Sequence, residues 1–171
     1  MVNAVVVYES IYGNTRAVAE AIAEGLGAGD VVSVRDAASG IHDAALLIVG
    51  GPTHIHGLAT ASSRRAALEA VSEDGADHVE PGAAEEPGLR SWLRDLPRRE
   101  NVRAAAFDTR LDRSPWFTGV ASRAIAKRLR RHGYEVIATE SFLVEDSEGP
   151  LADGELERAR AWGADLAQQL G

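Results

Sequence analysis

The sequence contains no cysteine among its 171 residues. Disulfides, thiolate catalysis, iron–sulfur clusters and cysteine-ligated zinc are therefore excluded. Long apolar runs are also missing, since the longest, at residues 44–49, is far too short to span a bilayer. The first residues have neither the basic segment nor the cleavage site of a signal peptide. We expect a soluble, cytoplasmic protein with no membrane span.

Basic residues are in the minority, with 18 Lys and Arg against 26 Asp and Glu, so the formal net charge is −8. This balance argues against non-specific binding of nucleic acid. Two interpretations of the acidity stay open: a surface field that attracts basic partners, or simple solubility. A chain of this length can bury enough surface to fold without a metal or disulfide.

Short apolar runs predict five β-strands. Continuous runs of this length are typical of strands buried on both faces of a sheet. The strands are expected at residues 5–7, 31–34, 45–49, 102–107 and 134–144.

Between these runs, apolar residues recur every three or four positions, as in amphipathic helices. In the second such segment, Ala67, Leu68 and Val71 are expected to face inward. The helices are expected at residues 14–26, 64–71, 89–96, 114–133 and 153–170.

Strands and helices thus alternate along the chain. This order predicts an α/β fold, a parallel sheet with helices on both faces, in a single domain over residues 1–171. Residues 72–88 are rich in Asp, Glu, Gly and Pro and poor in large apolar side chains. We expect them to form a mobile loop, because they cannot bury enough surface to order themselves.

In an open parallel sheet, ligands bind beyond the carboxyl ends of the strands. Three loops are expected there, at residues 9–15, 50–57 and 108–115. The first carries hydroxyl and amide donors next to the start of a helix, where free N–H groups and the helix dipole favour an anion. The residues that form this predicted phosphate cradle are Ser10, Ile11, Tyr12, Gly13, Asn14 and Thr15.

Neither of the two glycine-rich phosphate motifs, G-x-x-x-x-G-K-[ST] and G-x-G-x-x-G, occurs in this loop. A P-loop nucleotidase or a dinucleotide-binding domain is therefore not expected. The alternative to a phosphate cradle is that Ser10, Asn14 and Thr15 only cap the helix that follows.

The stretch at residues 6–22, VVYESIYGNTRAVAEAI, resembles the N-terminal signature of the flavodoxins at every position that the signature restricts. Residues 117–134 also resemble the fourth helix of that family and the entry to its fifth strand. The resemblance is weak only over residues 58–100. It implies a flavodoxin-like three-layer sandwich of the short-chain group, with a five-stranded sheet in the order 2-1-3-4-5, and FMN as the cofactor.

By this resemblance, the loop after the third strand touches the phosphate and the flavin ring. Pro52 and Thr53 match the phosphate-binding part. The ring-facing place, a large aromatic in many flavodoxins, falls on His54 or Ile55. Gly57 matches a position at which the backbone flips when the flavin is reduced. The remaining ring-proximal residue of this loop is His56.

The histidines of this loop have three interpretations: a metal site, proton donors to the flavin, or plain packing. We expect no metal, because no other His or carboxylate in the sequence is obviously placed to complete such a site. The Pro-Thr-x-x-x-Gly form also resembles flavodoxin-like quinone reductases, which leave the ring open to a second substrate.

The third loop is implied to face the ring and its pyrimidine end through Asp108, Thr109, Arg110 and Leu111. Arg110 is either a cation near flavin N1, which would raise the reduction potential, or a surface partner of Asp108 or Asp112. Ser114-Pro115 is expected to open the next helix, with Trp116 in the core or folded over the ring.

The predicted function is an FMN-binding redox protein that transfers electrons between partner proteins, with no catalytic residue of its own. Two alternatives stay open. One is an FMN-dependent NAD(P)H or quinone-type reductase acting on a small quinone-like acceptor. The other is a flavodoxin-fold domain that has lost tight flavin binding.

Overall fold

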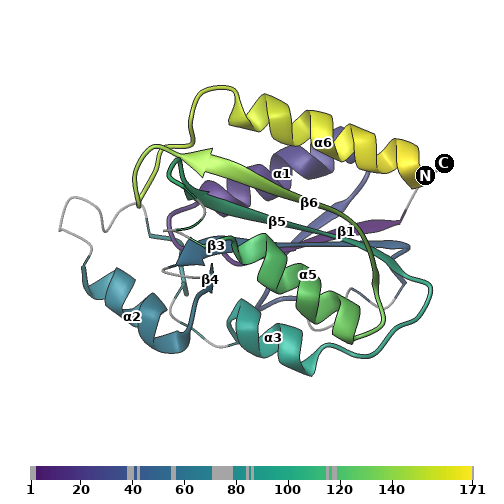
Figure 1. Cartoon of the computed structure of the whole chain (residues 1–171), viewed down its shortest axis with the longest axis horizontal. Coiled ribbons are helices and arrows are strands. Elements are labelled where there is room, and N and C mark those ends of the chain that lie inside the picture. Colours follow the sequence, from purple (N-terminus) through teal and green to yellow (C-terminus); the bar gives the residue numbers. More distant parts are fainter. Residues whose placement is uncertain are drawn as a thin grey trace.

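The computed structural model describes residues 3–37, 41, 43–54, 57–70, 79–83, 85, 87–114, 116 and 119–170. A sheet forms the middle layer, with α1 and α6 on one face and α3 and α5 on the other (Figure 1). No helix in the described part of the chain combines the length and the apolar character needed to cross a bilayer.

The five long strands are all parallel and run in the order β2-β1-β3-β5-β6, which confirms the predicted order. Their bounds are Ala4–Tyr8 (β1), Asp30–Ser33 (β2), Leu46–His54 (β3), Arg103–Leu111 (β5) and Glu135–Val144 (β6).

The third strand is longer than predicted, because the backbone stays extended through the Gly50-Gly51-Pro52 segment to His54. It then pairs in antiparallel fashion with a short strand, β4 (Gly57–Leu58), that the sequence did not lead us to expect. Gly57 has a φ of 144°, which residues with a side chain rarely adopt. The predicted loop at residues 50–57 is therefore largely a hairpin.

The described helices are α1 (Asn14–Leu26), α2 (Ala61–Glu69), α3 (Leu89–Asp95), α5 (Ala121–Arg131) and α6 (Glu155–Leu170). Helix α2 begins earlier than predicted, since Thr60 and Ser63 form a capping box.

Trp116 is itself helical, but Pro115 lies outside the described residues, so the prediction that Ser114-Pro115 opens a helix stays a prediction. Helix α5 begins only at Ala121. The first turn of α5 is capped by a residue of β5, since the Ser122 N–H donates to the Asp108 carboxylate at 2.7 Å. Trp116 is 87% exposed, so the expectation of a core position for it is wrong.

The inward face of α2 differs from the prediction. Ala67 and Leu68 are only half-buried, and Val71 lies outside the described residues. The fully buried side chain of this helix is Arg64, which lies against the Glu9 carboxylate with Nη1 3.1 Å from Oε1. Apolar spacing gives no signal for a buried arginine, so the sequence did not indicate this contact.

Alternate side chains of each buried strand enter opposite cores. Val5 and Val7 of β1 pack toward α3 and α5, whereas Val6 packs toward α1 and α6. The second core includes Phe107, Phe142 and Trp162 in edge-to-face contact.

Helices α1 and α6 cross at two glycines. A Cβ on Gly25 would lie 2.0 Å from the Arg160 carbonyl oxygen, and one on Gly163 would lie 2.2 Å from that of Ile22. We predict that Gly163→Ala destabilises the protein by about 1–3 kcal/mol, although alanine favours an isolated helix by about 1 kcal/mol. Urea unfolding measures this, and a gain in stability would show that the helices can separate at no cost.

Candidate functional site

A cavity of about 560 Å³ lies at the carboxyl ends of β1, β3 and β5. This is where an open parallel sheet binds its ligands, and the volume falls within the usual range for small-molecule sites. All three predicted loops contribute to it. The predicted residues that line it are Ser10, Ile11, Tyr12, Asn14, Thr15, Pro52, Thr53, His54, Thr109, Arg110 and Leu111.

The other predicted residues are not among those lining the cavity. Gly13 and Gly57 contribute backbone conformation instead, with φ values of 86° and 144°. Ile55 and His56 lie outside the described residues. The Asp108 side chain is fully buried and directed to the start of α5, so its carboxylate is a helix cap and not a wall of the cavity.

The loop before α1 is built from neutral donors. Gly13 is the residue before the helix, and its N–H donates to Ser10 Oγ at 3.1 Å. Thr15 Oγ1 lies 2.7 Å from Thr109 Oγ1, and both residues are buried, so a hydroxyl pair ties the first turn of α1 to β5. The first N–H groups of α1 have no partner within the helix. Such a loop can hold an anion without a positively charged side chain.

Two side chains of this loop brace its neighbours. The Asn14 amide Nδ2 donates to the Glu148 carbonyl at 3.0 Å, and the Tyr12 hydroxyl donates to the Ala67 carbonyl of α2 at 3.3 Å. Burial, and the charge of Glu148 to a smaller extent, raise the pKa of Tyr12, which stays a protonated donor. The loop is thereby joined to α2 and to the turn after β6.

The end of β3 presents Thr53 and His54. Thr53 Oγ1 accepts the Ala121 N–H of α5 at 3.0 Å. His54 Nε2 is buried and has no hydrogen-bond partner within the described residues. Burial, followed by the positive charge of Arg64, lowers the pKa of His54, so its imidazole is neutral at neutral pH. Among the described residues, the cavity wall therefore includes a neutral imidazole whose Nε2 is unpaired.

The end of β5 presents Arg110, whose Nη1 donates to the carbonyls of Leu111 at 3.3 Å and Arg113 at 2.9 Å. These bonds fold the turn that follows the strand. Arg110 Nε is buried without a hydrogen-bond partner among the described residues. Burial raises the pKa of Asp108, and the charge of Arg110 opposes that rise weakly.

Sequence reasoning missed part of the lining: Ala67, Ala70, Arg113, Val144, Ser147 and Glu148. Ser147 and Glu148 follow the fifth parallel strand, so the rule that ligands bind beyond strand ends was a usable signal for them. No such signal marks the alanines of α2. Within the described residues, no group of three or more His, Cys, Asp or Glu side chains is placed to hold a metal ion.

The fold and cavity define an open α/β domain with a small-molecule site at the point where strand order reverses. The family model for flavodoxin matches residues 6–162, and the chain belongs to the flavodoxin family.

Solved structures agree with this fold. A flavodoxin from the domain Archaea is 21% identical, with 98% of each chain covered and a TM-score of 0.62. A WrbA-like flavodoxin from Agrobacterium tumefaciens is 20% identical, with 99% of each chain covered and a TM-score of 0.61. Oxidised flavodoxin 1 from Bacillus cereus is 17% identical, with 99% of each chain covered and a TM-score of 0.60. A comparison with curated proteins gave no match.

Proposed function

We propose that the protein binds FMN in this cavity and transfers electrons between partner proteins. The observation that carries the proposal is the loop of residues 10–15, the anion loop, which offers uncharged hydrogen-bond donors to an anion. This loop lines a cavity of about 560 Å³ at the end of the sheet. Membership of the flavodoxin family supports the choice of a flavin as the occupant. When bound, FMN supplies the redox chemistry, and the chain supplies binding and tuning of the potential.

The residues present fit the polar and apolar parts of FMN. The hydroxyls of Ser10 and Thr15 and the first amides of α1 suit the phosphate. Ile11 and Leu111 offer apolar walls for the ring system. The buried polar atoms His54 Nε2 and Arg110 Nε, both on cavity-lining residues, suit its polar edge.

Purification tests the proposal directly. We expect yellow protein that releases equimolar FMN on denaturation, and flavin-free protein that binds FMN more tightly than riboflavin. Colourless protein that binds neither compound would overturn the assignment and favour a domain that has lost its flavin. Photoreduction then identifies the mode of transfer, because a carrier of single electrons is reduced in two resolved steps.

A reductase of quinone type is the second candidate function. It is favoured by the part of the cavity wall formed by the end of β3 and by α2, where the described lining residues include His54, Ala67 and Ala70 and no large aromatic. With this function, the flavin-loaded protein is expected to be reduced in a single two-electron step by a nicotinamide cofactor and then to reduce a quinone. Failure of NADH and NADPH to reduce the bound flavin would exclude it.

Arg110 is expected to raise the reduction potential of bound FMN. A cation beside the pyrimidine end stabilises the extra negative charge of the reduced flavin. We predict that Arg110→Gln lowers the two-electron midpoint potential by about 20–40 mV, which corresponds to about 1–2 kcal/mol. Redox titration with a dye of known potential measures this shift. Arg113→Gln, which changes a charge at the exposed rim, is the control, and equal shifts would remove the special role of Arg110.

A further inference from the structure

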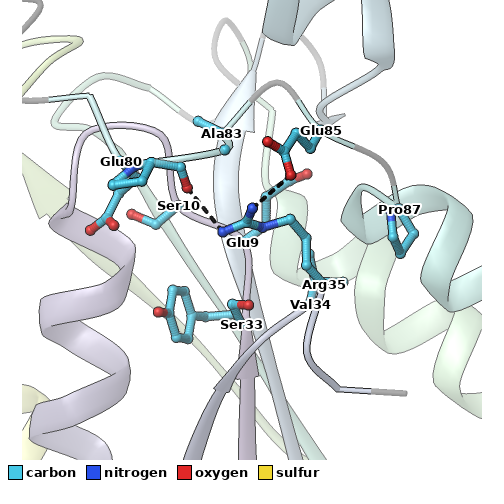
Figure 2. A pocket seen from close by; sticks show the side chains of 12 residues that line it. Glu9, Ser10, Ser33, Val34, Arg35, Glu80, Ala83, Glu85 and Pro87 are labelled. Atoms are coloured by element: carbon cyan, nitrogen blue, oxygen red, sulfur yellow. Dashed lines mark hydrogen bonds and ion pairs between the residues drawn. The ribbon is translucent and has the colours of Figure 1, made fainter.

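A turn at residues 79–83 lies against the outer side of the anion loop. The Glu80 N–H donates to the Ile11 carbonyl at 2.7 Å. Figure 2 shows this region, in which Glu80 and Glu85 lie on either side of the Arg35 guanidinium.

Arg35 holds the turn in place. Its Nη2 donates to the Pro81 carbonyl at 2.9 Å, and its Nη1 lies 2.9 Å from Glu85 Oε2 (Figure 2). A Cβ on Gly82 would lie only 1.9 Å from Arg35 Nη1, and Gly82 has a φ of +75°. The guanidinium therefore fits only because residue 82 is a glycine.

The bond from Glu80 fixes the direction of one peptide unit of the anion loop. In a trans peptide the carbonyl and the N–H point in opposite directions. Because the Ile11 carbonyl points outward to Glu80, the Tyr12 N–H of the same peptide points to the opposite side. Glu80 lines a separate pocket of about 40 Å³, whereas Ile11 and Tyr12 line the large cavity. The Tyr12 N–H is thus directed away from Glu80, and Tyr12 itself lines the large cavity.

The Glu80 side chain, unlike its main-chain N–H, disfavours an anion in the loop. Its Oε1 would lie 3.4 Å from a Cβ at Gly13, so a negative charge lies beside the loop. Its Oε2 lies 3.5 Å from Nη1 of Arg16, a residue that also binds Glu20 at 2.9 Å. The carboxylate repels an anion in the loop and occupies the nearby cation.

We propose that Glu80 is a positioning residue of the anion loop, whose main-chain N–H orders the loop for phosphate while its carboxylate limits the affinity. The proposal rests on the proposed FMN function, which it deepens by naming what sets phosphate recognition. Two variants of one residue should therefore have opposite effects.

Glu80→Gln keeps the N–H and removes the charge, and is expected to tighten FMN binding by about two- to fivefold. Glu80→Pro removes the N–H and is expected to weaken FMN binding by at least about tenfold. Gly82→Ala, which displaces Arg35 and leaves the Glu80 donor in place, is expected to weaken it as well. Riboflavin, which has no phosphate, should bind all three variants as it binds the unaltered protein.

The measurements are fluorescence titrations of flavin-free protein with FMN and with riboflavin. Glu100→Gln is the control, because it removes an exposed carboxylate that pairs with Arg98, away from the anion loop and from Arg35. FMN affinities of Glu80→Pro and Gly82→Ala equal to that of the unaltered protein would overturn the proposal. Equal losses for FMN and riboflavin would also overturn it, since they would indicate general disruption of the fold.

A second measurement needs no flavin. Inorganic phosphate added to the flavin-free protein should shift the Tyr12 amide resonance, and Glu80→Pro should abolish that shift. If the unaltered protein shows the phosphate shift but binds no FMN, the proposed function fails and the role of Glu80 stands. If the shift is the same in the variant, the role of Glu80 fails and the proposed function stands.

Discussion

Replacing Ser10 and Thr15 together by alanine is expected to weaken FMN binding by about a hundredfold or more. Ser10 Oγ shapes the loop by accepting the Gly13 N–H, and the buried Thr15 hydroxyl faces Thr109. Each hydroxyl that bonds to a charged group contributes about 1.5–3 kcal/mol, so the loss of two corresponds to at least two orders of magnitude. Riboflavin affinity should change by less than about threefold, because only FMN carries the phosphate that these groups recognise.

Titration of the flavin-free variant with both compounds measures the two losses side by side. Ser62→Ala is a suitable control, since it removes an exposed hydroxyl on α2 that contacts Thr60 and not the anion loop. A parallel drop for FMN and riboflavin would mean that these hydroxyls support the fold and that the phosphate binds elsewhere.

Arg64→Met is expected to destabilise the folded protein by about 3–5 kcal/mol. The exposed fractions of the Arg64 and Glu9 side chains are only 2% and 6%, so the substitution leaves a buried carboxylate without its main countercharge. The same Glu9 oxygen also accepts the Leu89 N–H at 3.1 Å. One ion pair therefore joins the end of β1 to α2 and to the first residue of α3. Denaturant unfolding measures the loss.

The double variant Glu9→Gln with Arg64→Met should recover much of that loss. Glutamine keeps an acceptor for the Leu89 N–H, and the buried charge is gone, so the desolvation cost disappears with it. A double variant as unstable as Arg64→Met would show that packing around Arg64, and not charge, is what matters. Arg98→Met should leave stability unchanged, because Arg98 and Glu100 are both mostly exposed.

Arg64→Met is also expected to affect the candidate site. Helix α2 supplies Ala67 and Ala70 to the cavity wall, and the Tyr12 hydroxyl binds the Ala67 carbonyl. Arg64 anchors this helix to the end of β1, directly before the anion loop. The ion pair thus sets the position of one wall relative to the loop.

Several features could be predicted because they depend on short stretches of chain. Val5, Val6 and Val7 form a strand with both faces buried, and this follows from their continuous apolar run. The loop at residues 10–15 precedes a helix, as its glycine, amide and hydroxyl residues indicated. The position of these residues at the cavity follows from the rule for parallel sheets, because the rule needs only the order of elements.

Other features depend on which segments meet in space. Asp108 is one of the residues that the resemblance places in the flavin-facing loop, and its carboxylate accepts the Ser122 N–H at the start of α5. Trp116 is a residue type that is usually buried, and one expectation placed it in the core, but its side chain is 87% exposed. Neither the cap on α5 nor the exposure of Trp116 follows from the residues that neighbour them in the chain.

The sequence by itself determined the alternation of buried strands and amphipathic helices, the family and the neutral loop before α1, since each of these is written in neighbouring residues. Only the tertiary structure decided that Arg64 is the buried residue of α2 and that Glu80 turns the Ile11 peptide. It also decided that Asn14 and Tyr12 brace other segments. The physical reason is that polar groups are satisfied by whichever partners folding brings near them, and residues separated by 55 or 134 positions leave no local pattern.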